Sequence, residues 1–225
     1  MRAIKSSQQF DKRGGVLDIW RYGAGAALVF FLCSPTAGAQ EETKDIKPYA
    51  AVRMTLENAD ANEFVFDNGY GGVVAAGVRY KEKWRAEISV SRRGSDVIGI
   101  PPIEAEGYFR AWAWLLNVYY HPFGVDRVIS PYAALGGGFN HASVEALATD
   151  PQYEGLGFPE QRYFEKSWQG KLGVALKLRE GVYLDAAAAY FVSDDHYVDA
   201  IYPHLDEVES AYRTYSALFG LRIEM

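Results

Sequence analysis

Two residues have the types and the spacing needed for nucleophilic catalysis. His141 and Ser143 are two positions apart, so on a β-strand their side chains would lie on the same face. An imidazole can remove the proton of a nearby hydroxyl, and Glu154 could orient that imidazole. A His-x-Ser pair also arises often by chance, and its ordinary interpretation is the end of a strand. We favour the ordinary interpretation and predict no catalytic residue.

A second candidate is the stretch between Val192 and Arg213, which contains no Lys or Arg. Its acidic residues and histidines are Asp194, Asp195, His196, Asp199, His204, Asp206, Glu207 and Glu209. Clustered carboxylates could hold Ca²⁺ or Mg²⁺ and so bridge anionic phosphates, but the spacing of a dedicated calcium loop is missing. We therefore predict a solvated acidic loop over 194–209, with neither a metal nor a cofactor.

The elements that position these residues are strands. At the end of the chain, Tyr215, Phe219, Leu221 and Ile223 occupy odd positions, while Gly220, Arg222 and Glu224 occupy even ones. A period of two places the two sets on opposite faces of a β-strand. The chain is therefore predicted to end inside a sheet.

Seven further segments show strand patterns. With the last one, the eight predicted strands are roughly 48–57, 69–81, 83–93, 108–121, 129–145, 164–178, 182–192 and 212–225. Most have ten or more residues, whereas strands in soluble sheets usually have about five or six. A tilted strand that spans a membrane needs about 9–11 residues. The apolar positions do not recur at three and four, which excludes helices here.

An apolar and a polar face are clear in several of the predicted strands, whereas the strand over 108–121 is apolar on both faces and is placed with its tryptophans outward and Asn117 inward. The outward residues include Val52, Met54, Leu56, Trp84, Ile88, Trp112, Trp114, Leu116, Val118, Trp168, Leu172, Leu184, Phe219, Leu221 and Ile223. The inward charged residues are Arg53, Arg79, Arg85, Glu87, Lys171, Lys177, Asp185, Arg222 and Glu224. In a small barrel, side chains fill the interior, and buried charges must be paired. We predict a salt-bridged plug in the lumen, with a narrow selective pore as the alternative.

The predicted connections alternate in length. Short ones fall at 81–83, 121–128 and 179–181, and long ones at 58–68, 94–107, 146–163 and 193–211. Short periplasmic turns and long extracellular loops are typical of barrels in the bacterial outer membrane. The glycine groups at 69–72 and 136–138 match no nucleotide-binding loop. Within strands they favour bending or close packing against lumen side chains.

Residues 1–39 are predicted to be a secretory signal peptide. Basic residues come early, an apolar run covers 24–33, and Ala37-Gly38-Ala39 fits cleavage before Gln40. The apolar run is too short to cross a bilayer as a helix, which needs about 20 residues. Cys33, the single cysteine, leaves with the signal, so no disulfide is expected. The predicted organisation is a signal peptide at 1–39, a short segment at 40–47 and a barrel at 48–225.

Composition limits the possible functions of the mature chain. Removing 39 of 225 residues leaves 186, enough for one domain, with 18 basic and 27 acidic residues and a net charge of −9. Nucleic-acid binding needs a basic surface, so it is excluded. Aromatic residues make up 15% of the chain. Interleaved with apolar strand residues, they favour interfacial girdles over base stacking.

The central segments also carry a family resemblance. Asn117-Val-Tyr-Tyr120, followed by Pro131-Tyr-Ala-Ala-Leu-Gly-Gly-Gly-Phe139, resembles the central hairpin of eight-stranded outer-membrane β-barrel proteins. These include the OmpA transmembrane domain and the opacity-type small porin family. The resemblance covers 48–225 and implies insertion by the barrel-assembly machinery. That family usually ends in an aromatic residue, a place that Met225 takes here.

The resulting prediction is an all-β protein: an eight-stranded antiparallel up-and-down transmembrane β-barrel of the outer membrane. Its expected role is non-enzymatic, either structural or in adhesion and surface interaction through long acidic loops. We expect a monomer in contact with lipid and lipopolysaccharide, with a possible extracellular ligand. The alternatives are a small porin-like channel, a lipid A hydrolase using His141 and Ser143, as some small outer-membrane barrels use a His-x-Ser pair, and a soluble lipocalin-type barrel.

Overall fold

The computed structural model describes residues 46–60, 65–100, 103–149, 157–194, 196–198, 208–210 and 212–225. Eight long strands occupy most of these residues: β1 (Ile46–Asp60), β3 (Gly69–Tyr80), β4 (Trp84–Ile100), β5 (Ile103–Tyr120), β6 (Ile129–Ala148), β7 (Gly157–Arg179), β8 (Val182–Ser193) and β11 (Arg213–Glu224). Three short strands accompany them: β2 (Val65–Phe66), β9 (His196–Val198) and β10 (Val208–Ser210). Within the described residues, no helix is long and apolar enough to cross a membrane.

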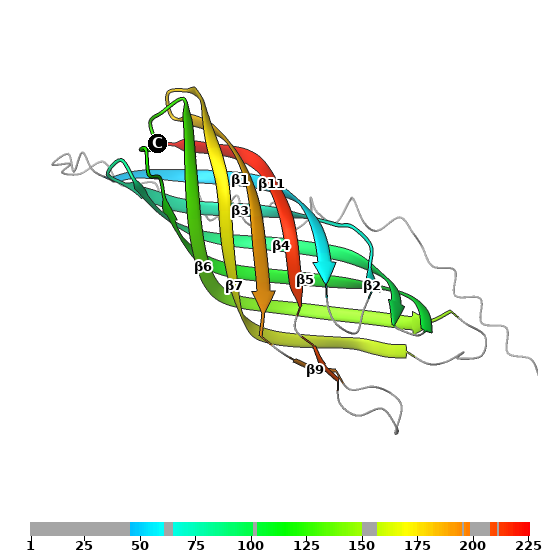
Figure 1. Cartoon of the computed structure of the whole chain (residues 1–225). Coiled ribbons are helices and arrows are strands. Elements are labelled where there is room, and N and C mark those ends of the chain that lie inside the picture. Colours follow the sequence, from blue (N-terminus) through cyan, green and yellow to red (C-terminus); the bar gives the residue numbers. More distant parts are fainter. Residues whose placement is uncertain are drawn as a thin grey trace, which may run out of the picture. The chain divides into compact units, whose positions relative to one another are not determined.

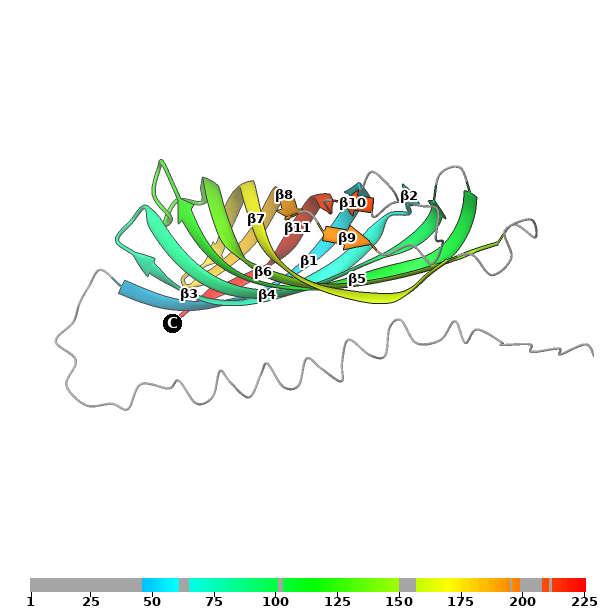
Figure 2. The ribbon, with the colours of Figure 1, turned by 90° about the horizontal axis from the view of Figure 1, so that it is seen from below.

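The long strands close into a single antiparallel barrel (Figures 1 and 2). Their order is β4-β3-β1-β11-β8-β7-β6-β5, and the pairing of β4 with β5 completes the ring. At the seam, β1 pairs with β11, so that Arg53 lies opposite Gly220. The backbone N–H of Met225 donates to the Pro48 carbonyl at 2.9 Å. The predicted fold class and the predicted pairing of the first and last strands are confirmed.

Burial follows the predicted alternation. The outer face exposes large apolar side chains, with Ile88 at 65%, Leu135 at 76% and Leu172 at 69% exposure, which suits a lipid environment. Arg85 and Glu87, on the other face of β4, are each 1% exposed. Buried polar and charged residues, among them Arg53, Asp185 and Arg222, therefore line the lumen together with buried apolar residues. This distribution argues against the lipocalin alternative, which needs apolar residues around a ligand cavity and polar residues outside.

The barrel wall is higher on one side. β4 to β7 have 17, 18, 20 and 23 residues, whereas β3, β8 and β11 have 12 each. Figure 1 shows the longer strands extending past the ends of β8 and β11. The predicted loop over 94–107 is therefore wrong in most of its length, and the predicted loop over 146–163 is too long. Ser95 and Val97 continue the buried face of β4 and pair with β5, which keeps the ladder intact.

Tight turns join the strands at the opposite end of the barrel, where β1 begins and β11 ends. Lys81–Lys83 and Glu180–Gly181 form two of them. Gly181, at φ 71°, and Gly124, at φ 88° in the third turn, adopt left-handed conformations that glycine accepts without strain. The three short connections are confirmed. Within the long connection after β8, β9 and β10 pair with each other as a small antiparallel ladder.

Candidate functional site

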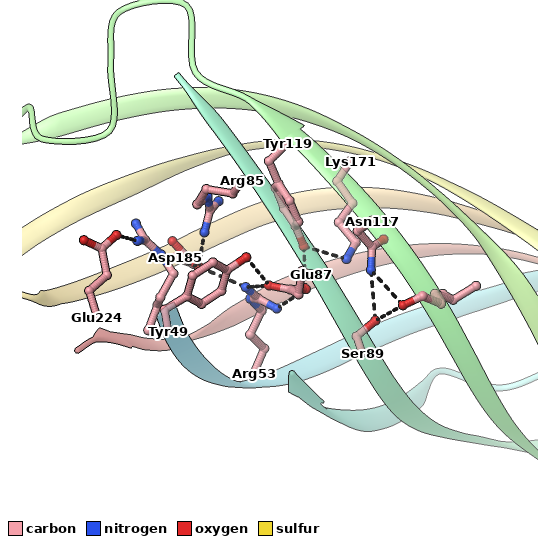
Figure 3. Close-up of polar contacts among 12 residues, drawn as sticks. Tyr49, Arg53, Arg85, Glu87, Ser89, Asn117, Tyr119, Lys171, Asp185 and Glu224 are labelled. Atoms are coloured by element: carbon pink, nitrogen blue, oxygen red, sulfur yellow. Dashed lines mark hydrogen bonds and ion pairs between the residues drawn. The ribbon is translucent and has the colours of Figure 1, made fainter. Parts of the chain in front are cut away.

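Glu87 is the centre of a buried polar cluster in the lumen (Figure 3). Arg53 donates from Nη1 to Oε1 at 3.0 Å and from Nη2 to Oε2 at 2.7 Å. The Tyr119 hydroxyl donates to Oε1 at 2.7 Å, and the Tyr49 hydroxyl donates to Oε2 at 3.2 Å. All four side chains belong to residues at most 3% exposed. The bidentate ion pair with Arg53 and the two hydroxyl hydrogen bonds offset the free-energy cost of burying the Glu87 carboxylate.

Asp185 of β8 collects three guanidinium groups from three other strands. Its Oδ2 accepts a hydrogen bond from Arg53 of β1 at 3.2 Å. The same oxygen lies 3.8 Å from Nη1 of Arg85 on β4 and 3.6 Å from Nε of Arg222 on β11. All four residues are at most 3% exposed. This carboxylate therefore holds together four strands that surround the lumen.

The network continues to the end of the barrel that carries the tight turns. Arg222 donates from Nη1 to Glu224, whose other oxygen lies 3.7 Å from Nη1 of Arg79. Arg79 also donates to Asp126 at 2.7 Å, in the turn between β5 and β6. Burial raises the pKa of Asp126, but the hydrogen bond and charge of Arg79 outweigh it and leave the pKa below its ordinary value. This turn is thus tied to the lumen by an ionised carboxylate.

Tyrosine rings surround the cations of the network. The Arg85 guanidinium lies 4.4 Å from the ring centroid of Tyr119 and 5.2 Å from that of Tyr132. The Arg222 guanidinium lies 3.9 Å from the centroid of Tyr183. These cation–π contacts add attraction where water is excluded. The rings also occupy volume, so charge and bulk fill this part of the barrel together.

His121 connects the same turn to Arg85. Arg85 donates from Nε to His121 Nε2 at 2.9 Å, and His121 Nδ1 lies 2.7 Å from Ser130 Oγ. Because arginine only donates, Nε2 must be the acceptor, and Nδ1 then carries the proton. The Ser130 hydroxyl in turn donates a hydrogen bond to the Gly124 carbonyl at 2.7 Å. Burial lowers the pKa of His121 to about 2, in the same direction as the charge of Arg85, so the ring is neutral.

The other half of the lumen, toward the long connections, is filled differently. Arg93 donates to Thr214 at 2.9 Å and lies 3.7 Å from Glu57. Farther toward the long connections, Phe109 stacks on Tyr212 with ring centroids 4.1 Å apart. The two rings belong to a buried apolar cluster formed by Val97, Phe109, Ala111, Ala113, Leu115, Ala142, Val144, Ala146, Phe191 and Tyr212. The barrel interior thus has a charged half and an apolar half.

The inward charges predicted from the sequence lie on the expected face, and the structure brings most of them into one network. Lys177 is the exception, because its ion pair is with Glu180 of a tight turn at 3.1 Å. Sequence reasoning missed Arg93 and His121. Arg93 continues the odd-numbered polar face of β4, so its place could have been predicted. No sequence pattern predicts that His121 joins the network, because its position depends on how the turn after β5 folds over the lumen.

The predicted catalytic candidates lie elsewhere. His141 and Ser143 are partly buried, in register with the outward face of the barrel wall, between the buried positions Asn140, Ala142 and Val144. Glu154 and most of the acidic stretch 194–209 lie outside the described residues. Within the described part of the chain, no group of three or more His, Cys, Asp or Glu side chains could hold a metal ion.

The glycine groups act as predicted at several positions. A Cβ on Gly136 would meet the side chain of Asn117, and one on Gly71 would meet Thr55. Gly69 similarly faces Ser95. These glycines leave room for lumen side chains on the neighbouring strand.

Comparison with known proteins agrees with this geometry. A family model described as an outer membrane protein beta-barrel domain matches residues 24–220. Neisserial surface protein A has a similar structure, with a TM-score of 0.55 and 16% identity over 79% of this chain and 97% of that protein. At this identity the likeness shows a common fold. The attachment invasion locus protein Ail of Yersinia pestis, crystallised with the heparin analogue sucrose octasulfate, has a TM-score of 0.48 and 10% identity, covering 80% of this chain and 99% of Ail. No curated protein matches the chain.

Proposed function

This chain belongs to the outer-membrane β-barrel family and resides in the bacterial outer membrane, and from that premise we propose that it is a non-enzymatic, non-conducting surface protein. In this role the barrel is an anchor. The end that carries the tall β4–β7 wall and the long connections faces outward and meets extracellular ligands. The end with the tight turns and both barrel termini faces the periplasm.

The observation that carries this proposal is the filled lumen. Arg53, Glu87, Asp185 and Arg222 come from four different strands and form one connected network. Removing one member would leave a buried charge without its partner, which costs several kcal/mol. An ion crossing the barrel would have to separate these pairs. A closed plug therefore fits the geometry better than an open path.

Conductance across planar bilayers tests this function. We expect the refolded mature protein to give no stable single-channel steps in neutral salt, at voltages where a porin control conducts. Reproducible steps would contradict the plug and favour the channel alternative. In that case Lys171→Gln should change the ion selectivity, because Lys171 is buried in the lumen, where it donates to Tyr119 at 3.2 Å.

One placement keeps the hydrolase alternative testable. His141 and Ser143 occupy outward register positions: His141 lies level with its cross-strand partners Trp112 and Phe164, and Ser143 lies two residues farther along β6. Lipid headgroups could reach such a site. The non-enzymatic proposal expects lipid A to keep all its acyl chains when the protein is overexpressed. Loss of one acyl chain from lipid A that Ser143→Ala abolishes would contradict the non-enzymatic proposal.

The processing of the chain is part of the same proposal. Residues 1–39 are removed on export, residues 40–45 precede β1, which begins at Ile46 and not at the predicted residue 48, and the barrel-assembly machinery inserts the barrel as a monomer. The mass of the protein extracted from outer membranes tests the first step, with Gln40 as the expected first residue. A mass that includes residues 1–39 would contradict it.

A further inference from the structure

The outer face of β4–β7 shows an ordered sequence of side-chain types. It begins with a wide apolar band, which ends in exposed aromatic residues: Trp114 at 43%, Phe139 at 50%, Phe164 at 68% and Trp168 at 58% exposure. Aromatic residues of this kind mark the interface of a bilayer. Around and just beyond these rings, the outward positions carry basic residues: Arg92 on β4, Arg110 on β5, and Arg162 and Lys166 on β7.

Strand register brings these four basic residues, hereafter the basic rim, onto one patch. Arg110 and Arg162 flank Ser143 from the two neighbouring strands. Arg92 pairs with Trp112, two residues along β5 from Arg110, so Arg92 and Arg110 are diagonal neighbours about 7–8 Å apart. Arg110, Arg162 and Lys166 are exposed, and Arg92 is half-buried.

Aromatic rings hold two of the guanidinium groups in place. The Arg92 guanidinium lies 5.9 Å from the ring of Trp112, and the Arg110 guanidinium lies 4.3 Å from the ring of Tyr108. Within the described residues, neither forms an ion pair. A planar guanidinium beside a ring keeps N–H groups on its edge, the geometry that binds phosphate oxygens in pairs. The two groups are thus preorganised as donors at the level of the bilayer interface.

The acidic residues of this face lie one step farther from the apolar band. Tyr108 of β5 pairs with Glu145 on β6 and with Asp96 on β4. Glu104 and Glu106 lie beyond them on β5. Moving away from the apolar band, the order is therefore aromatic, basic and then acidic. A lipid presents acyl chains, then the interface, then its phosphates, and the basic rim meets the phosphate level while the carboxylates lie above it.

We propose that the basic rim binds the phosphate groups of an anionic glycolipid of the outer leaflet, the lipid A part of lipopolysaccharide. Its apolar chains lie against the exposed wall of β4–β7, and the phosphates accept hydrogen bonds and charge from Arg92, Arg110, Arg162 and Lys166. The barrel thereby binds this lipid on its β4–β7 wall. This inference uses the outward orientation of the proposed function but does not depend on a closed lumen.

Binding of fluorescent lipid A to the folded full-length mature protein in neutral detergent micelles tests the proposal. The test variant changes all four residues of the basic rim to Gln. The matched control changes four exposed basic residues at the opposite end to Gln: Lys47, Lys81, Lys83 and Arg179. Each cation near an anionic surface contributes roughly a fivefold increase in affinity. We therefore expect the rim variant to bind at least about tenfold more weakly, and the control to stay within about twofold of the wild type.

Two further arms identify the ligand. Dephosphorylated lipid A should bind the wild type as weakly as intact lipid A binds the rim variant. Inorganic phosphate should not displace intact lipid A. Equal binding of the phosphorylated and dephosphorylated lipids, equal losses in both variants, or displacement by free phosphate would overturn the proposal. Heat-modifiable gel migration checks folding, and if the fourfold variant does not fold, the comparison of the two lipids on the wild type decides.

Discussion

Among single residues, Glu87 is the one on which the polar network of the lumen depends most. Glu87→Gln keeps the size of the side chain but removes the charge that balances Arg53. Taking one partner from a buried ion pair costs about 3–5 kcal/mol, so the urea midpoint of the refolded protein should fall clearly. Glu180→Gln is the matched control, because Glu180 is 85% exposed in its pair with Lys177. Equal midpoints for Glu87→Gln and the control would refute the network.

His121 gives a second residue-level prediction, in the dependence of stability on pH. Its pKa is about 2 in the folded protein and about 6.5 in an unfolded chain. Below pH 6.5 the unfolded state takes up a proton that the folded state does not, so stability is lost as pH falls, by about 1.4 kcal/mol per unit. Between pH 6.5 and 5 the wild type should lose about 2 kcal/mol more than His121→Gln. Parallel curves for the two proteins would contradict the buried neutral ring.

For a single residue, the sequence predicts the face of the strand on which it lies better than the residue with which it pairs. Period-two alternation alone is enough to place Arg53 and Asp185 in the lumen. Which charges meet depends on the tilt and stagger of the strands, which link positions several residues apart in register. Arg53 reaches Glu87, two strands away, for this reason. Single-sequence patterns carry no information on that stagger.

At the scale of elements, the seam between β1 and β11 is tightly packed. A Cβ on Gly220 would meet the Val52 carbonyl and lie 2.7 Å from Cγ of Arg53. Gly220→Ala should therefore lower stability by about 1–3 kcal/mol, the usual cost of overpacking. Gly72→Ala is the control, because its Cβ would meet one heavy atom, at 3.9 Å. Urea unfolding measures both, and a Gly220→Ala protein as stable as the control would show that the seam can relax.

The lengths of β4 and β5 show where element prediction failed. Gly94, Ser95 and Asp96 combine loop-forming residue types, and this composition predicts a loop. In the structure Ser95 is 5% exposed in the lumen, and Asp96 lies on the outer face. Beyond the membrane the outer face no longer has to be apolar, so the contrast between the two faces disappears while the hydrogen-bonded ladder continues.

At the scale of the whole molecule, the barrel combines three regions. A charged half of the lumen lies beside the tight turns, an apolar half lies toward the long connections, and a tall wall rises on one side. In the function that we propose, the first region seals the barrel and the wall carries the basic rim. The molecule that we propose is therefore a closed anchor with a lipid-binding face on the β4–β7 wall.

Thiol labelling of single cysteines in intact cells distinguishes a sealed, oriented barrel from an open or inverted one. Cys33 lies in the predicted signal peptide, so the mature chain offers a cysteine-free background. Three positions suffice: Glu104 beyond the membrane on β5, Glu82 in a tight turn, and Ser89, 2% exposed in the lumen. A membrane-impermeant maleimide should label Glu104→Cys at once, Glu82→Cys only after the outer membrane is permeabilised, and Ser89→Cys in neither case. Labelling of Ser89→Cys as fast as Glu104→Cys, or of Glu82→Cys in intact cells, would contradict the sealed and oriented barrel.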